Sequence, residues 1–547
     1  SLLIYLIHFP KFQFALIVAA FAVLISANDQ PESRIVNIAQ GPVKGYRGSE
    51  GHYFAFLGIP YATAPTGPNK FKAPLPPPTW TEPLEAIQNG IACPQSEDWP
   101  YKPEDCLIAN VYVPDTKETN LPVIVHVHGA GFQRGHGNSQ TGKNLLKMKN
   151  IIIVNFNYRL GAHGFLCLGT KDIPGNAAMK DKVTLLRWVQ RNIAYFGGNP
   201  NDVTIDGWSS GAASVDLIMI SKMGKGLFHK VIVQSAASGT SFSVQVDPVQ
   251  NAKNVAKELG FEDVDNIEGL EAFYKDTPLE MLYSLNFFMV KNSSTIFSPC
   301  IERDLGEEMF LDDFPINILS HGDYPKVPVL YGITAMEGIF RVMFFELWKL
   351  DMNENFANFL PQDLIFESEE QKQLISHKVK RFYFDNQLVS EKTILNYIDY
   401  FSDVMFAYGV AKTVELQVAA GNNQIYLYNY AFEDIRTDYI PYTSMRGATH
   451  CAQTHALLDE DDEDNLVEEY RKMKKTMRDI WINFVTTGKP VPEGSSYPAW
   501  PPVGAHRSPY MLLNGTMELH EKFLGKRADF WNEIYSKHYR RPVPPTY

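Results

Sequence analysis

Residues 203–215 constrain the fold of this chain more than any other stretch. A short β-branched, apolar run that ends at Ile205 predicts a buried strand, and the small residues after Ser209 predict the start of a helix. Gly207 and Gly211 flank Ser209 at equal spacing. Glycine permits a sharp turn that a Cβ would obstruct, so the pattern predicts a nucleophile elbow that holds the Ser209 hydroxyl clear of the backbone. An ordinary Gly/Ser-rich turn is the alternative.

Length and composition limit the class of protein. The chain has 547 residues, of which 45% are hydrophobic and 20% are charged. This composition is typical of globular proteins and suffices for a large core. A net charge of −12 argues against a nucleic-acid partner, and part of that charge lies in the acidic run 459–464, which is expected to be a solvated loop. Without an internal repeat or a break in composition, we expect a single α/β domain over residues 28–547.

The N-terminal segment has the pattern of a signal peptide. Lys11 precedes an apolar run at residues 14–25, and small residues follow it up to Ala27. The run is too short to span a bilayer, so we expect residues 1–27 to be removed and the mature protein to be secreted, with no membrane contact. A membrane anchor stays open as the alternative, because residues 2–7 are also apolar.

Cysteines and glycan acceptors fit an extracellular protein in part. Cys93 and Cys106 enclose a short polar loop that a disulfide could close. Three other cysteines have no evident partner and are expected to be small buried thiols: Cys167, Cys300 and Cys451. Asn292 and Asn514 each begin an Asn-x-Ser/Thr sequence, which predicts a glycosylated surface.

Strand and helix patterns alternate through about the first 240 residues, which predicts a parallel sheet covered on both faces. The predicted strands are 35–46, 53–61, 121–127, 151–156, 203–205 and 230–234, with later ones at 327–331 and 424–430. The predicted helices are 180–195, 247–259, 370–384, 393–416 and 468–487.

A serine nucleophile needs a base to take its proton and an acid to orient that base. After a nucleophile elbow the expected chain order is serine, acid, histidine. Glu337 follows the predicted strand 327–331, and His450 lies beyond the predicted strand 424–430, so loops could carry both over the sheet edge. His455, five residues on, is a rival for the base.

The second half of such a site is an oxyanion hole. Residues 128–131, His-Gly-Ala-Gly, resemble the loop that offers backbone N–H groups to a developing negative charge. One such donor lowers a barrier by roughly 3–4 kcal/mol. The N–H of Ser210, which follows the nucleophile, would supply another donor. A Gly-rich turn without this role is the alternative.

Further motifs are spread over nearly all of the chain after the N-terminal segment. They are FLGIPYA at 56–62, EDCL at 104–107, NYRLG at 157–161, PGN at 174–176 and NIAYFGGNP at 192–200. With these motifs the chain resembles the type-B carboxylesterase and cholinesterase-like family of α/β-hydrolases, and in particular secreted esterases of the insect type.

The resemblance implies an α/β-hydrolase fold with a large, mostly parallel sheet, and hydrolysis of a small-molecule ester without a metal or organic cofactor. It places the family's functional residues as follows: the triad on Ser209, Glu337 and His450; the oxyanion hole on Ala130, Gly131 and Ser210; a serine near the triad on Ser235; and the N-terminal disulfide on Cys93 and Cys106.

Three departures from the family pattern bear on activity. Trp208 stands where cholinesterases carry glutamate, which predicts an apolar pocket and an uncharged ester rather than a choline ester. Ala130 replaces the middle glycine of the oxyanion loop and would be strained if φ is positive there. Residues 451–453 replace the usual acidic pair after His450. A secreted binding protein and a scavenger with slow turnover therefore remain alternatives to an efficient esterase.

Overall fold

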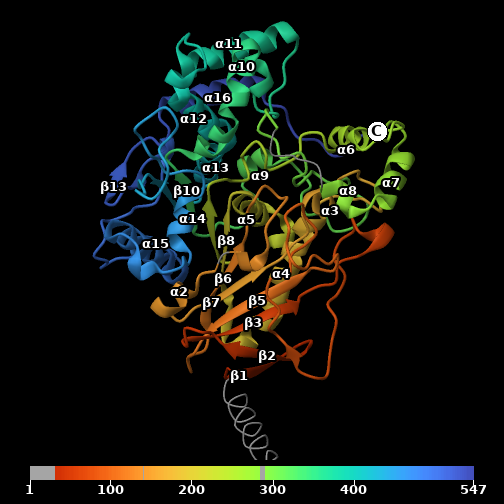
Figure 1. Cartoon of the computed structure of the whole chain (residues 1–547), viewed down its shortest axis with the longest axis vertical. Helices are drawn as coiled ribbons and strands as arrows, with labels where there is room; N and C mark the ends of the chain where they lie inside the picture. The colour runs from red at the N-terminus through yellow and green to blue at the C-terminus, as the bar shows by residue number, and fades with distance from the viewer. Residues whose placement is uncertain (1–30, 140, 284–289) are drawn as a thin grey trace, which may run out of the picture.

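A thirteen-stranded sheet runs through the part of the chain that the computed structural model describes, residues 31–139, 141–283 and 290–547. The predicted signal peptide, residues 1–27, lies outside the described residues. Figure 1 shows the sheet in the middle of the molecule with helices packed on both sides and a helical region above it.

The strands follow the order β1-β2-β3-β5-β7-β6-β8-β9-β10-β11-β12-β13, and β4 pairs with β2. Their bounds are β1 Ser33–Ile38, β2 Gly41–Arg47, β3 Tyr53–Pro60, β4 Leu84–Glu85, β5 Ile108–Pro114, β6 Leu121–Val127, β7 Ile152–Phe156, β8 Gly198–Trp208, β9 Lys230–Gln234, β10 Val329–Thr334, β11 Ile425–Tyr430, β12 Tyr510–Leu513 and β13 Met517–His520. The strands from β7 to β12 in this order are parallel. The pairs β1–β2, β2–β3, β3–β5, β5–β7 and β12–β13 are antiparallel.

The main α-helices are α2 Lys143–Met148, α3 Gly161–Phe165, α4 Ala177–Asn192, α5 Ser210–Ile220, α6 Pro248–Glu258, α7 Ile267–Asp276, α8 Leu279–Tyr283, α9 Pro315–His321, α10 Phe345–Glu354, α11 Glu369–Phe384, α12 Ile394–Ser402, α13 Tyr408–Ala419, α14 Ala452–Leu457, α15 Glu468–Thr487 and α16 Lys526–His538. The predicted helix 468–487 and the predicted strands 121–127 and 230–234 coincide with α15, β6 and β9.

Two predicted elements are wrong in detail. The predicted strand 35–46 is a hairpin, because the chain reverses at residues 39–40 and Ile38 pairs with Gly41. The predicted helix 393–416 is interrupted at Asp403–Ala407 by a π-helical turn, η9, which joins α12 to α13. A π-turn adds one residue to a helical turn and re-aims the side chains that follow it.

The central strands bury side chains on both faces, which explains their continuous apolar runs. In β9, Val231 and Val233 belong to the larger hydrophobic cluster, whereas Ile232 packs in a second cluster with Trp481 of α15. Every residue of α5 is buried. The helix that follows the elbow is therefore fixed against the sheet and cannot shift independently of it.

Two disulfides cross-link the described chain. Cys93 is joined to Cys106, the pairing that the family resemblance implied. The expectation for Cys167 and Cys300 is wrong, because they are joined to each other across 133 residues of sequence. Of these five cysteines only Cys451 is free, and it is buried. Within the described residues, no helix combines the length and the apolar character needed to cross a bilayer.

Candidate functional site

The turn that carries Ser209 joins β8 directly to α5. Ser209 has φ 54° and ψ −125°, a strained backbone conformation. A Cβ on Gly207 would lie 2.3 Å from the carbonyl oxygen of Gly211, and a Cβ on Gly211 would lie 2.2 Å from that of Val127. Both positions therefore require glycine, as the motif predicted. The Ser209 N–H donates to the Gln234 carbonyl at 2.8 Å and so ties the turn to β9.

The imidazole of His450 lies between Ser209 and Glu337. Its Nε2 is 2.8 Å from the Ser209 Oγ, and its Nδ1 pairs with Oε2 of Glu337. The Glu337 side chain is fully buried, and its Oε1 accepts the Thr334 N–H at 2.8 Å. A carboxylate fixed at both oxygens holds the imidazole with Nε2 towards the hydroxyl. The arrangement can move a proton between Ser209 and His450.

Aromatic rings that the sequence analysis did not predict cover the imidazole. Phe406 stacks on the His450 ring with 4.1 Å between centroids and 24° between planes, and Phe340 lies 5.5 Å away. Phe242 contacts Phe406 at 5.8 Å. Phe406 belongs to η9, so the π-turn delivers this ring to the histidine. The imidazole is therefore packed against apolar rings, while its two nitrogens face Glu337 and Ser209.

The loop after β6 has three successive residues with positive φ: Ala130 at 75°, Gly131 at 66° and Phe132 at 62°. The φ of Ala130 is therefore positive, the case in which the sequence analysis expected strain at this residue. Among the described residues, the backbone N–H groups of Ala130, Gly131 and Ser210 have no hydrogen-bond acceptor. The Phe132 N–H donates to the Ser210 Oγ at 3.1 Å, which holds the loop beside the start of α5. The loop after β6 and the start of α5 therefore both carry free backbone donors.

Buried rings brace this loop from behind. The His128 and Tyr158 rings stack at 4.3 Å, and the Tyr158 hydroxyl donates to the His128 carbonyl oxygen at 2.5 Å. Burial lowers the pKa of His128 to about 3, so its imidazole is neutral at physiological pH. The Lys182 Nζ lies 3.6 Å from the centroid of the other Tyr158 face. The loop is thus held by a rigid stack instead of by a flexible turn.

Trp208 and the residues after His450 complete the surroundings. The Trp208 ring lies so close to Gly129 that a Cβ there would meet ring carbons at 2.6 Å, so the indole packs on the oxyanion loop. The Ser235 Oγ accepts a hydrogen bond from Gln453 Nε2 at 2.7 Å. The Cys451 Sγ lies 3.5 Å from His450 Nε2, and burial raises the pKa of this thiol.

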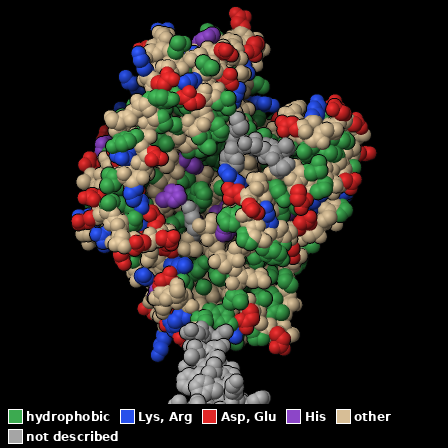
Figure 2. Space-filling view, viewed as in Figure 1, with side chains coloured by type: hydrophobic (Ala, Val, Ile, Leu, Met, Phe, Trp, Pro, Cys, Tyr) green, Lys and Arg blue, Asp and Glu red, His purple; other side chains and the backbone are tan. Residues whose placement is uncertain are grey.

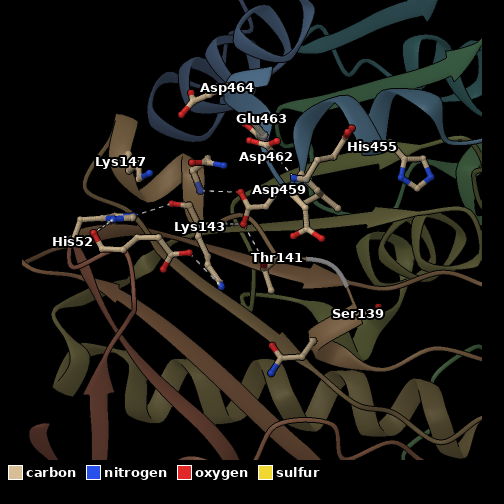
Figure 3. Close-up of a pocket in the computed structure, with 16 residues that line it drawn as sticks. His52, Ser139, Thr141, Lys143, Lys147, His455, Asp459, Asp462, Glu463 and Asp464 are labelled. Carbon is tan, nitrogen blue, oxygen red and sulfur yellow. Dashed lines mark hydrogen bonds and ion pairs between the residues drawn. The ribbon is translucent and has the colours of Figure 1, made fainter. Parts of the chain in front are cut away.

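The rival base, His455, lies elsewhere. It is on α14 and lines a polar cavity of about 650 Å³ between α2 and the acidic run 459–464. In this cavity Asp459 accepts the N–H groups of Lys143 and Asn144, and no hydrogen bond or ion pair joins His455 to the other residues drawn (Figure 3). No group of His, Cys, Asp or Glu in the described part of the chain is arranged to hold a metal ion.

Figure 2 shows acidic and basic side chains intermingled on the face drawn, with apolar side chains between them.

The predicted glycan acceptors differ in access: Asn514 is exposed between β12 and β13, whereas Asn292 is partly buried.

Comparison with known proteins places this geometry in a family. The profile of the Carboxylesterase family matches residues 32–531. Esterase FE4 of Myzus persicae is 34% identical over 87% of this chain and 88% of its own length. Juvenile hormone esterase of Heliothis virescens is 31% identical over 86% of this chain and 88% of its own length. The crystal structure of juvenile hormone esterase from Manduca sexta, with OTFP covalently attached, superposes with a TM-score of 0.82 at 28% identity over 92% of this chain and all of the other. The chain therefore belongs to the carboxylesterase family of α/β-hydrolases and is a carboxylic ester hydrolase.

Proposed function

We propose that the protein is a serine carboxylesterase that hydrolyses uncharged, apolar esters through an acyl-enzyme intermediate. One observation carries the proposal: the Ser209 Oγ lies 2.8 Å from His450 Nε2, and Glu337 holds the opposite nitrogen of the same ring. The orienting acid Glu337 is 113 residues from His450 in the sequence, and the nucleophile Ser209 is 241 residues from it. Such a constellation is the general arrangement for nucleophilic acyl transfer.

In the first half of the reaction, His450 Nε2 takes the proton of Ser209 as Oγ attacks the ester carbonyl carbon. Glu337 stabilises the imidazolium that forms. The N–H groups of Ala130, Gly131 and Ser210 donate to the oxyanion, and each contributes only once charge has developed there. His450 then protonates the departing alcohol, and Ser209 keeps the acyl group.

In the second half, water replaces the alcohol. His450 takes a proton from the water as its oxygen attacks the acyl carbon, and the same N–H groups stabilise the second oxyanion. The tetrahedral intermediate collapses, the proton returns from His450 to the Ser209 oxygen, and the carboxylic acid leaves. Ser209 and His450 end as they began.

The side chains around the triad support the proposed substrate class. Phe406, Phe340 and Phe242 provide aromatic surface beside His450. Position 208 carries an indole and lacks the carboxylate that would attract a cationic alcohol. An uncharged ester with an apolar acyl or alcohol group buries surface against these rings, whereas a quaternary ammonium would lack a paired charge there.

A series of p-nitrophenyl esters with increasing acyl length tests this function. We expect kcat/KM to rise with chain length beyond acetate until the pocket is filled, and butyrylcholine to be a poor substrate. Ser209→Ala removes the nucleophile, whereas Ser49→Ala changes an exposed serine far from the triad and serves as the control. Turnover in Ser209→Ala equal to that of the control would refute the serine mechanism. One equivalent of released nitrophenol without further turnover would indicate a scavenger.

We also propose that residues 28–547 form one secreted domain. Two disulfides within the chain suit an oxidising compartment, and the Asn514 acceptor is exposed. Expression in insect cells should give a protein in the medium that starts at Asn28 and loses mass on treatment with a glycosidase. An intact N-terminus on a protein retained with the cells would contradict this proposal.

A further inference from the structure

A second small cavity, separate from the triad, lies between α9, α13 and α16. Its volume is about 210 Å³, and its walls are mainly apolar. We call it the tyrosine pocket; its lining residues are Gly239, Ile316, Asp363, Tyr408, Lys412, Asn532, Tyr535, Ser536 and Tyr539. Figure 1 shows α9, α13 and α16 in the upper part of the molecule, above the sheet that carries the elbow. None of the lining residues belongs to the triad or to the oxyanion loop.

Three aromatic rings form one wall of the tyrosine pocket. Tyr408 and Tyr535 stack with 4.9 Å between centroids, and Tyr539 lies 6.0 Å from Tyr535. The Tyr408 hydroxyl donates to Asn532 Oδ1 at 3.0 Å, which fixes this ring. Faces of tyrosine rings attract cations through their quadrupoles.

Asp363 is a carboxyl group in this wall without a cationic partner. It is 7% exposed, and its side chain accepts hydrogen bonds from the Tyr535 hydroxyl, at 2.7 Å, and from its own backbone N–H. No lysine, arginine or histidine nitrogen of the described chain lies within 4 Å of it, because nearby cations pair elsewhere: Lys412 with Glu415 and Arg540 with Asp247. An ionised carboxylate can accept about four hydrogen bonds, so part of its capacity is unused.

Burial without a counter-ion makes the charge of Asp363 costly. Desolvation raises the pKa of its carboxyl group from 3.8 to about 6, so the group is ionised at pH 7 and above. An ammonium group placed against Asp363 would supply both the missing charge and the missing donors. The tyrosine rings would cover the hydrocarbon part of the same molecule.

We propose that the tyrosine pocket is a binding site for a small organic ammonium ion, with Asp363 as its counter-ion and the rings of Tyr408, Tyr535 and Tyr539 as its wall. The volume is below the range of about 300–1,000 Å³ that holds drug-sized ligands, so the ligand carries one ring or a short chain. This site is independent of the proposed ester hydrolysis, since it uses no residue of the triad.

Calorimetric titration of the full chain tests the site with two probes of equal shape. Benzylamine is an ammonium ion at a pH of about 8, where Asp363 is ionised, and benzyl alcohol is its neutral counterpart. The titrations use the Ser209→Ala variant, so the outcome does not depend on catalysis. We expect benzylamine to bind one site at least tenfold more tightly than benzyl alcohol. Equal binding of the two probes, or no saturable binding of benzylamine, would overturn the proposal without touching the esterase assignment.

Two variants locate the binding. Asp363→Asn keeps the shape of the side chain and removes its charge, so benzylamine affinity should fall at least tenfold. Asp265→Asn removes an exposed carboxylate paired with Lys253 and should leave the affinity unchanged. Circular dichroism checks that both variants fold. Benzylamine binding by Asp363→Asn with the affinity of Asp265→Asn would exclude this pocket as the site.

Discussion

Glu337→Gln gives a prediction whose size can be worked out from the contacts of one side chain. The Thr334 N–H needs an acceptor at 2.8 Å, so the carbonyl oxygen of the new amide must take that side. Its NH₂ group then faces His450 Nδ1 and donates to it. The neutral imidazole must carry its proton on Nε2, which faces the Ser209 hydroxyl. A protonated Nε2 cannot accept the proton of Ser209.

Two costs follow from this change. The imidazolium of the transition state loses a charge-assisted hydrogen bond, which costs about 2–3 kcal/mol, and restoring the active tautomer leaves two buried donors facing each other, which costs about 1–3 kcal/mol. The two costs sum to about 3–6 kcal/mol, so at about 1.4 kcal/mol per tenfold change in rate kcat/KM should fall by about 10²–10⁴. In a serine protease triad, replacement of the orienting aspartate by asparagine lowers kcat by about 10⁴.

The assay is the steady-state hydrolysis of p-nitrophenyl butyrate at a pH of about 8. Glu337→Asp is the matched control: it keeps the charge but is one methylene shorter, and we expect a smaller loss, about 10–100-fold. Circular dichroism shows whether both variants are folded. A Glu337→Gln protein that retains kcat/KM within tenfold of wild type would refute the role of this carboxylate.

Three further predictions concern the frame around the site and the tyrosine pocket. Gly211→Ala places a Cβ 2.2 Å from the Val127 carbonyl oxygen, so the elbow must distort. The rate of ester hydrolysis should fall at least 100-fold, while the far-ultraviolet circular dichroism spectrum stays close to that of wild type. Full activity of this variant would contradict the close approach of the two backbone segments. Cys167→Ser should lower the denaturant midpoint by an amount equal to that of Cys300→Ser, and the double variant should add nothing, because all three lack the same cross-link. Asp363 has a raised folded-state pKa, so it contributes stability below pH 3.8 that is lost as pH rises through about 6. The Asp363→Asn variant should therefore have a larger free energy of unfolding than wild type at pH 8, by at most about 3 kcal/mol. In urea titrations this difference should shrink as the pH is lowered towards about 4. A destabilised variant at pH 8 would show that the carboxylate has a cationic partner in the folded protein.

The parts of the fold that local pattern controls could be predicted from the sequence. The β-branched run before Ser209 and the glycines around it specify the strand, the turn and the helix by sterics within a few residues. The amphipathic pattern of α15 has the same local origin, and Gly488, with φ 76°, ends that helix. Glu337 and His450 could be placed after strands, but choosing His450 over His455 required the family resemblance.

Features that depend on distant contacts could not be predicted. Cys167 and Cys300 are 133 residues apart, and nothing local indicates that they meet. The ring of Phe406 reaches His450 only through the π-turn in a segment whose pattern predicts a continuous helix. Asp363 resembles any surface aspartate in the sequence, and only the packing of three helices buries it. The hydrophobic pattern indicates that a residue is covered but not which residues cover it.

The central claim is that Ser209 forms the covalent bond to the acyl group. Rapid mixing of the protein with a p-nitrophenyl ester, followed by acid quench and peptide mass spectrometry, measures this directly. We predict a burst close to one equivalent of nitrophenol and an acylated peptide that carries the added mass on Ser209, with neither in Ser209→Ala. An acylated peptide from another part of the chain, or hydrolysis that leaves Ser209 unmodified and persists in Ser209→Ala, would contradict the account.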